Sequence, residues 1–118
     1  MEWNLDDSRP IWPQIKEKLM KDIVSGKYPS GTSFPTVREL AAEAMVNRNT
    51  MQRALGELEN EKLVVTNRTA GRTVTTDESL LAHTRKVLAE GEVERVVKEM
   101  YSLGFTAEQI VDLIKEAI

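Results

Sequence analysis

The chain has 118 residues, of which 41% are hydrophobic and 30% charged, and this balance predicts one small globular domain or a domain with a short appendage. The absence of cysteine excludes disulfides, cysteine-bound zinc and thiol nucleophiles, and the single histidine, His83, excludes a histidine-based metal or catalytic cluster. No run of 18 apolar residues occurs, and the start, MEWNLDD, lacks the features of a signal peptide. We therefore expect a cytoplasmic protein that is not an enzyme, holds no metal or other cofactor and does not enter a membrane.

The charge is distributed unevenly around a formal net value of −3. Residues 9–75 contain eleven basic and seven acidic side chains, a net of +4, whereas residues 76–118 contain five and nine, a net of −4. A locally basic segment favours a polyanionic partner, although many solvated surfaces have the same asymmetry.

Three helices are predicted in the first half of the chain. Residues 10–25 begin with proline, precede a glycine and carry an apolar residue at every fourth position. Thr36 and Glu39 form a capping box that opens a second, short helix, and Asn47 is a good N-cap for a third helix at roughly 48–60. The short turn between the second and third helices is typical of a helix-turn-helix.

The third helix has two distinct faces by the 3.6-residue period. The face expected to enter the core carries Met51, Ala54, Leu55 and Leu58. The opposite face carries Asn49, Gln52, Arg53 and Gly56, with Arg48 at its edge, and it has no carboxylate before Glu57. Such a face suits base edges and phosphates, although it could simply be solvated, and Arg53 could instead pair with Glu57.

Two β-strands are predicted next, at 63–66 and 73–76, from their β-branched residues. The turn between them, 67–72, contains two arginines. A helix-turn-helix followed by a basic hairpin is a winged helix; the alternative is a small α+β core with a solvent-exposed hairpin.

The last part of the chain predicts a helix from about 79 to 103 and a second helix opened by a capping box at Thr106 and Gln109. These two helices carry more aliphatic surface than they can bury against each other, which favours self-association. We therefore expect an α+β protein: an N-terminal winged helix-turn-helix of three helices and a β-hairpin wing at 1–76, then a two-helix dimerisation hairpin at 77–118.

Three segments of the chain resemble the GntR family of bacterial transcription regulators: PIWPQI at 10–15, FPTVRELAAEAMVNRNTMQRALGELE at 34–59 and LVVTNRTAGRTVT at 63–75. LGFTAEQI at 103–110 is similar to the C-terminal helical hairpin of the short YtrA-like branch. The resemblance implies a homodimeric repressor that binds an inverted repeat in double-stranded operator DNA, often in an operon with transporter genes such as those of an ABC transporter.

The resemblance also assigns roles to individual residues. It implies that Arg38 contacts DNA, that Arg48 contacts bases or nearby phosphates, and that Thr50 contacts a phosphate. In the wing, the family's basic-Gly-x-Gly pattern is altered because Thr69 follows Arg68. The full set of predicted DNA-binding residues is Thr36, Arg38, Asn47, Arg48, Asn49, Thr50, Gln52, Arg53, Arg68, Thr69, Gly71 and Arg72.

Each assignment has a structural alternative: Arg38 could pair with Glu39 or Glu43, and Arg72 could be an ordinary strand-edge arginine. At the level of function, one alternative is a regulator that binds a small molecule at the dimer interface, although residues 77–118 are too few to enclose a pocket of usual size and no such ligand is predicted. Another is a protein-interaction module that has lost DNA binding, which intact Arg38 and Arg48 argue against.

Overall fold

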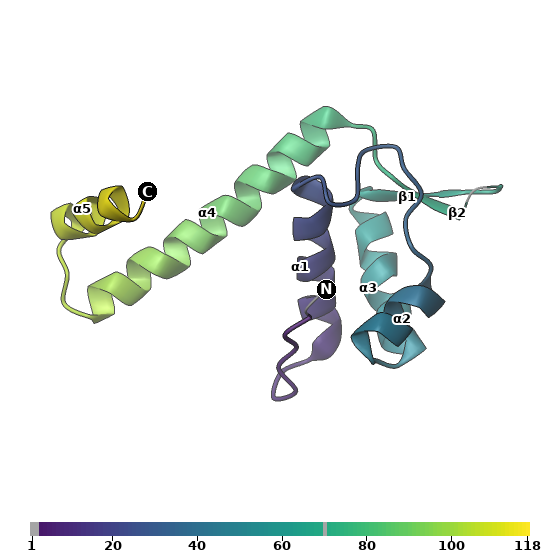
Figure 1. Ribbon diagram of the computed structural model, residues 1–118, viewed down its shortest axis with the longest axis horizontal. Coiled ribbons are helices and arrows are strands. Elements are labelled where there is room, and N and C mark those ends of the chain that lie inside the picture. The colour runs from purple at the N-terminus through teal and green to yellow at the C-terminus, as the bar shows by residue number, and fades with distance from the viewer. Residues whose placement is uncertain (1–2, 70) are drawn as a thin grey trace. The chain divides into compact units, whose positions relative to one another are not determined.

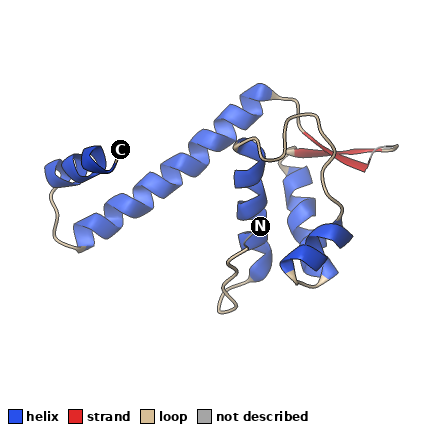
Figure 2. Cartoon of the chain, in the orientation of Figure 1, coloured by secondary structure: helices blue, strands red, loops and turns tan. Residues whose placement is uncertain are grey.

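The computed structural model describes residues 3–69 and 71–118 and contains five helices and a two-stranded hairpin in the order α1-α2-α3-β1-β2-α4-α5 (Figures 1 and 2). The chain divides into two compact units, one ending at Arg85 and the other beginning at Lys86. This division falls inside α4, some residues after the boundary expected at 76.

The core of the first unit lies between α1 (Ile11–Val24), α2 (Val37–Ala44) and α3 (Arg48–Asn60). Both α1 and α2 pack against α3, which also contacts β1. The largest side chains that are fully buried there are Ile15, Leu19, Leu40, Met51, Leu55, Leu58, Leu63, Val64 and Val74. The predicted core face of α3 is confirmed, and the opposite face of this helix is left for solvent.

The caps predicted for α2 and α3 are present. The Thr36 hydroxyl accepts a hydrogen bond from the Glu39 amide at 3.1 Å, and the Glu39 carboxylate accepts one from the Thr36 amide at 3.3 Å. The Asn47 side chain accepts from the Asn49 amide at 2.7 Å. Between the helices, Met45 has the left-handed φ of +58° that closes the tight turn. The helix-turn-helix is therefore confirmed.

The hairpin pairs β1 (Val64–Asn67) with β2 (Gly71–Val74) in antiparallel register, from Val64 opposite Val74 to Asn67 opposite Gly71. The second strand thus begins two residues earlier than predicted, because the backbone ladder continues past the β-branched residues and leaves a shorter turn. The same strand is held on its other side, where the Phe34 amide donates to the Arg72 carbonyl at 2.8 Å. Three helices with this hairpin form the predicted winged helix.

The final helices are α4 (Glu78–Ser102) and α5 (Ala107–Ala117). The first turns of α4 belong to the first unit, where Leu81 is buried and the Arg85 guanidinium donates to the Val24 carbonyl at 3.0 and 2.8 Å. In the second unit, the rest of α4 and α5 form a helical hairpin in which Ile110 is only 4% exposed. The predicted capping box at Thr106 opens α5.

Candidate nucleic-acid interface

The outward face of α3 carries five of the twelve predicted site residues. The side chains of Arg48, Asn49, Gln52 and Arg53 are all exposed, and that of Thr50 is half-buried. Their exposure follows from the period of the helix, since the alternate face is occupied by the core residues of α3. These five side chains therefore form one continuous polar surface, which we call the α3 face.

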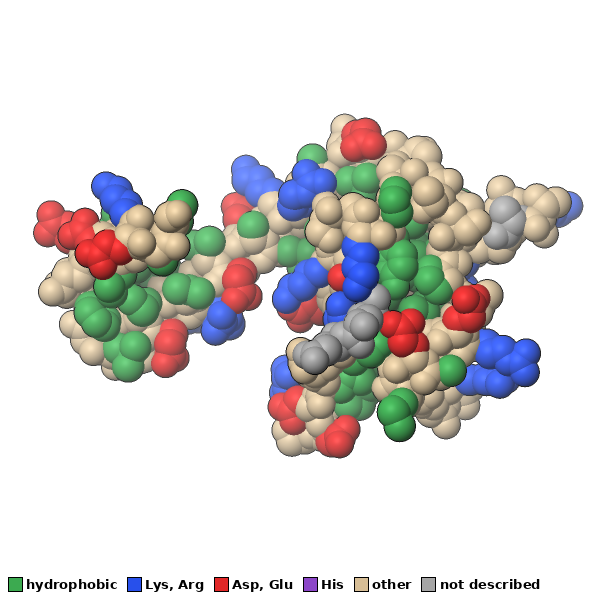
Figure 3. All heavy atoms as spheres, in the orientation of Figure 1, with side chains coloured by type: hydrophobic (Ala, Val, Ile, Leu, Met, Phe, Trp, Pro, Cys, Tyr) green, Lys and Arg blue, Asp and Glu red, His purple; other side chains and the backbone are tan. Residues whose placement is uncertain are grey.

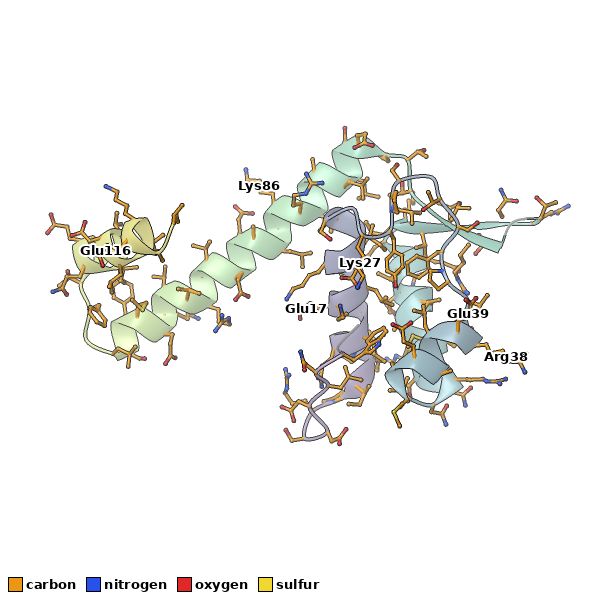
Figure 4. All side chains as sticks on the ribbon, in the orientation of Figure 1. Glu17, Lys27, Arg38, Glu39, Lys86 and Glu116 are labelled. Atoms are coloured by element: carbon orange, nitrogen blue, oxygen red, sulfur yellow. The ribbon has the colours of Figure 1, made fainter. Side chains whose placement is uncertain are left out.

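Two arginines, one within the α3 face and one on α2, are unpaired. Arg38 is exposed and extends away from α2 in Figure 4, while Arg48 stands at the first residue of α3. Among the described residues, neither guanidinium has an ion pair or a hydrogen bond; the carboxylate of Glu39 instead accepts from the Thr36 hydroxyl at 3.0 Å. Both charges are therefore available to an external anion.

The third arginine, Arg53, has a neighbour on another helix. Its guanidinium carbon lies 4.4 Å from the ring centre of Trp12 on α1, which is a cation–π contact. Arg53 therefore contacts Trp12 instead of forming the ion pair with Glu57 that was the alternative from the sequence. The ring limits the freedom of the Arg53 side chain without neutralising its charge.

The two arginines of the hairpin have different surroundings. Arg68 is exposed and has no partner among the described residues, and Figure 3 shows a basic side chain at the far end of the hairpin. The side chain of Arg72 is only 20% exposed and pairs with Glu59 on α3. Arg72 therefore does not join the free cations of the site, because its guanidinium is directed at a carboxylate of the protein.

Four further predicted residues have structural roles in the turns and caps. The Thr36 hydroxyl and the Asn47 side-chain oxygen are both used as helix caps. Thr69 is exposed, and its amide and hydroxyl donate to the Asn67 side chain at 3.0 and 3.1 Å. Gly71 has a φ of +71°, a left-handed conformation that favours glycine at the end of the turn. Ala70, which lies in the same turn, is outside the described residues.

Sequence reasoning did not find Trp12 or Glu59 as partners of site residues. Trp12 is half-buried, and nothing in the spacing of the residues links it to Arg53. Glu59 lies in the last turn of α3, and its position in the sequence does not indicate a partner on the hairpin. Both contacts join residues that are distant in sequence, so no local pattern indicates them.

In the described ranges 3–69 and 71–118, no three His, Asp or Glu side chains gather as potential metal ligands. Within the same ranges, none of the helices combines the length and the apolar character that crossing a bilayer requires.

Residues 13–74, more than half of the chain, match the family model described as bacterial regulatory proteins, gntR family. The chain belongs to the GntR family. The uncharacterized HTH-type transcriptional regulator YhcF of Bacillus subtilis (strain 168) is 31% identical over 98% of this chain and 95% of its own. The HTH-type transcriptional repressor YtrA of the same strain is 27% identical over 92% of this chain and 85% of its own, in line with the expected YtrA-like branch.

Solved structures of family members resemble this GntR protein in fold. A GntR family transcriptional regulator from Listeria monocytogenes has a TM-score of 0.86 and 36% identity, with 95% of this chain and 98% of that chain covered. The DNA-binding domain of AraR in complex with operator ORR3 has a TM-score of 0.51 and 30% identity, with 54% of this chain and 77% of that chain covered. The relatives are transcriptional regulators, and the winged helix predicted from the sequence is the fold they share.

Proposed function

We propose that this GntR protein is a homodimeric repressor that acts by occupying an inverted repeat in operator DNA. The observation that carries the proposal is the α3 face, which has no acidic side chain before Glu57 and lies in a unit with the unpaired Arg38 and Arg68. A surface of arginine and amide side chains can donate to phosphates and to base edges in the major groove. Further support is the operator complex of the related AraR domain.

The elements suggest a division of labour at the DNA. In helix-turn-helix proteins the second helix of the motif enters the major groove by its N-terminal residues, and the first helix crosses the backbone. Arg48, Asn49 and Gln52 then read bases, with Arg53 beside them, while Arg38 and Thr50 contact phosphates. Arg68, Thr69 and Gly71 at the end of the hairpin approach the adjacent groove. Thr36 and Asn47 act through the helix N-termini that they cap, where amides face an anion.

A second copy of the chain is proposed to cover the apolar surface of the second unit. Val93 is 58% exposed, Leu103 64% and Ile114 40%, and Figure 3 shows hydrophobic side chains along α4 and α5. Isolated monomers seldom leave such a set of aliphatic side chains in water, and a two-fold dimer would match an inverted repeat. Residues 77–118 thus serve dimerisation, and residues 1–76 serve DNA binding.

Repression needs only these two properties, because a dimer seated on an operator excludes other proteins from it. An effector-controlled regulator is the second candidate, but the apolar groove that Val93, Val96, Glu92 and Ile114 line in the second unit holds about 190 Å³. That is smaller than the roughly 300–1,000 Å³ of ordinary ligand pockets and better suited to a packed side chain. We place the protein in the bacterial cytoplasm, and sequencing the genes next to its own tests whether it controls a transporter operon.

The binding experiment uses a duplex that the intact chain selects from a randomised pool, called the selected duplex below. Fluorescence anisotropy measures its affinity at several salt concentrations, beside a scrambled duplex. Each phosphate neutralised by a cation contributes roughly −0.9 to the slope of log K against log salt, so a dimer with several contacts gives a slope of several units. Failure to select any sequence, or affinity independent of salt, contradicts the proposal.

A further inference from the structure

A single carboxylate on α3 holds both strands of the hairpin. Thr66 on β1 and Arg72 on β2 stand opposite each other in the ladder. The Thr66 hydroxyl donates to Oε1 of Glu59 at 2.9 Å, and Nε of Arg72 donates to the same oxygen. One cross-strand pair is therefore tied to the C-terminal half of the helix whose N-terminal half carries the α3 face.

The charge on Glu59 is maintained in this position. Partial burial raises the pKa of its carboxyl group, but the hydrogen bonds from Arg72 and Thr66, together with the Arg72 charge, lower the pKa by more, so that it lies below its ordinary value. The group is thus ionised at neutral pH and forms a charged pair that is mostly shielded, with 20% of the Arg72 side chain and 31% of the Glu59 side chain exposed. Charge-assisted hydrogen bonds of this kind hold a direction as well as a distance.

Arg72 is also fixed through its backbone. Its carbonyl accepts from the Phe34 amide at 2.8 Å, and the neighbouring Thr73 forms an isolated bridge with Ser33, both in the segment that leads into α2. The side chain of Arg72 therefore contacts α3 while its main chain contacts the approach to α2. Since a two-stranded hairpin is only marginally stable alone, its direction depends on such outside contacts.

We propose that Glu59 and Arg72 are positioning residues that fix the angle between the wing and α3, so that Arg68 and the α3 face meet the DNA in one register. The inference rests on the proposed function, and it assigns Arg72 to the protein rather than to a phosphate. The specificity of DNA binding then depends on a contact between two residues that do not themselves contact DNA. With the wing at another angle, Arg68 does not reach the DNA when α3 lies in the major groove.

A double-mutant cycle between Glu59→Gln and Arg68→Ala tests this with the full chain and the selected duplex. In the intact background, Arg68→Ala is expected to weaken binding roughly tenfold, the factor that corresponds to losing one good charged contact. In the Glu59→Gln background, the loss of affinity caused by Arg68→Ala is expected to be at least about threefold smaller, because the energetic effects of coupled residues are not additive. Amide hydrogen exchange of the hairpin without DNA is expected to accelerate in Glu59→Gln, which a change in DNA contact alone would not cause.

Glu57→Gln is the matched control, because it removes the same charge from α3 and its carboxylate has no partner among the described residues. This control should leave the cost of Arg68→Ala unchanged. The exchanged pair Glu59→Arg with Arg72→Glu should restore part of the coupling. Equal losses from Arg68→Ala in both backgrounds would overturn the proposal, as would tighter binding by Glu59→Gln with a salt slope steeper by about one unit, the sign of an Arg72 released to a phosphate. If the intact chain selects no duplex, the proposed function fails instead.

Discussion

The central carbon of the Arg53 guanidinium on α3 lies 4.4 Å from the ring centre of Trp12 on α1. The contact connects α3, the helix proposed to read DNA bases, to α1. An arginine held on an aromatic ring loses less conformational freedom when it binds an anion, and it keeps its full charge. Trp12 is therefore expected to contribute to DNA affinity without contacting DNA.

Replacing Trp12 by leucine removes the ring and keeps an apolar side chain. A cation–π contact at an exposed site contributes about 0.5–1 kcal/mol, so Trp12→Leu should weaken binding to the selected duplex roughly two- to fivefold. In an Arg53→Ala background the same change should have no further effect, and Trp12→Phe should retain part of the affinity. Anisotropy at one salt concentration measures the intact chain and the four variants, and equal losses of affinity on Trp12→Leu with and without Arg53 would refute the coupling.

Arg38→Ala and Arg48→Ala are expected to differ in which duplex they bind more weakly. Arg38→Ala should weaken binding to the selected and scrambled duplexes by similar factors, because a residue on the first helix of the motif contacts the backbone. Arg48→Ala should cost about 1–3 kcal/mol per half-site, mainly on the selected duplex, which is the contribution of a good base contact. Neither change should lower the unfolding temperature, since both side chains are exposed. If Arg48→Ala weakens binding to both duplexes equally, specificity depends on Asn49, Gln52 and Arg53.

The exposed apolar surface of α5 should decide the oligomeric state. Ile114→Asp places a charge beside Val93 and Val96 in the groove of the second unit, and it should shift the chain from dimer to monomer at micromolar concentration. Lys115→Asp is the control, because it introduces the same side chain one residue away at an exposed charged position and should leave the dimer intact. Sedimentation velocity distinguishes the two species. A dimeric Ile114→Asp chain would place the interface elsewhere.

Three of the described non-glycine residues have a positive φ: Asn4 with +46°, Met45 with +58° and Lys62 with +64°, and the last two lie at the ends of helices. A side chain raises the energy of that conformation by about 1–2 kcal/mol, of which the extra freedom of unfolded glycine cancels part. Met45→Gly and Lys62→Gly should each stabilise the protein by about 0.5–1 kcal/mol, seen as a higher thermal midpoint at equal protein concentration. Met45→Ala keeps the strained angle and should bring no gain; stabilisation by alanine would mean that the methionine side chain, which is 90% exposed, is the cause.

The Glu59 contact predicts a particular pH dependence of stability. Because folding lowers the pKa of this carboxyl group, its contribution is fully present above the unfolded value near 4.5 and is lost as the pH falls through the lowered, folded value. Glu59→Gln should therefore reduce the free energy of unfolding at pH 7 by up to about 1 kcal/mol, a value typical of a partly exposed pair. Chemical unfolding of both chains at pH 7 and at pH 3 measures the difference. A difference that does not become smaller between pH 7 and pH 3 would indicate lost packing instead of lost charge.

Much of this protein was determined by its sequence alone, because the relevant signals lie within one or two helical turns. The box at Thr36 and Glu39, the Asn47 cap and the buried face of α3 all depend on residues three or four positions apart, and all are present as predicted. The strand that begins at Gly71 was predicted too late, since backbone pairing with β1 extends it through residues of low β-propensity.

Only the tertiary structure decided which arginines are free. Arg53, Arg68 and Arg72 look alike in the sequence, each a basic residue near a proposed DNA surface. Folding places Trp12 against the first and Glu59 against the third, and it leaves Arg68 without a described partner. The reason is that a side chain's electrostatic environment is set by whatever lies within a few ångströms of it, and here those neighbours come from other helices and strands.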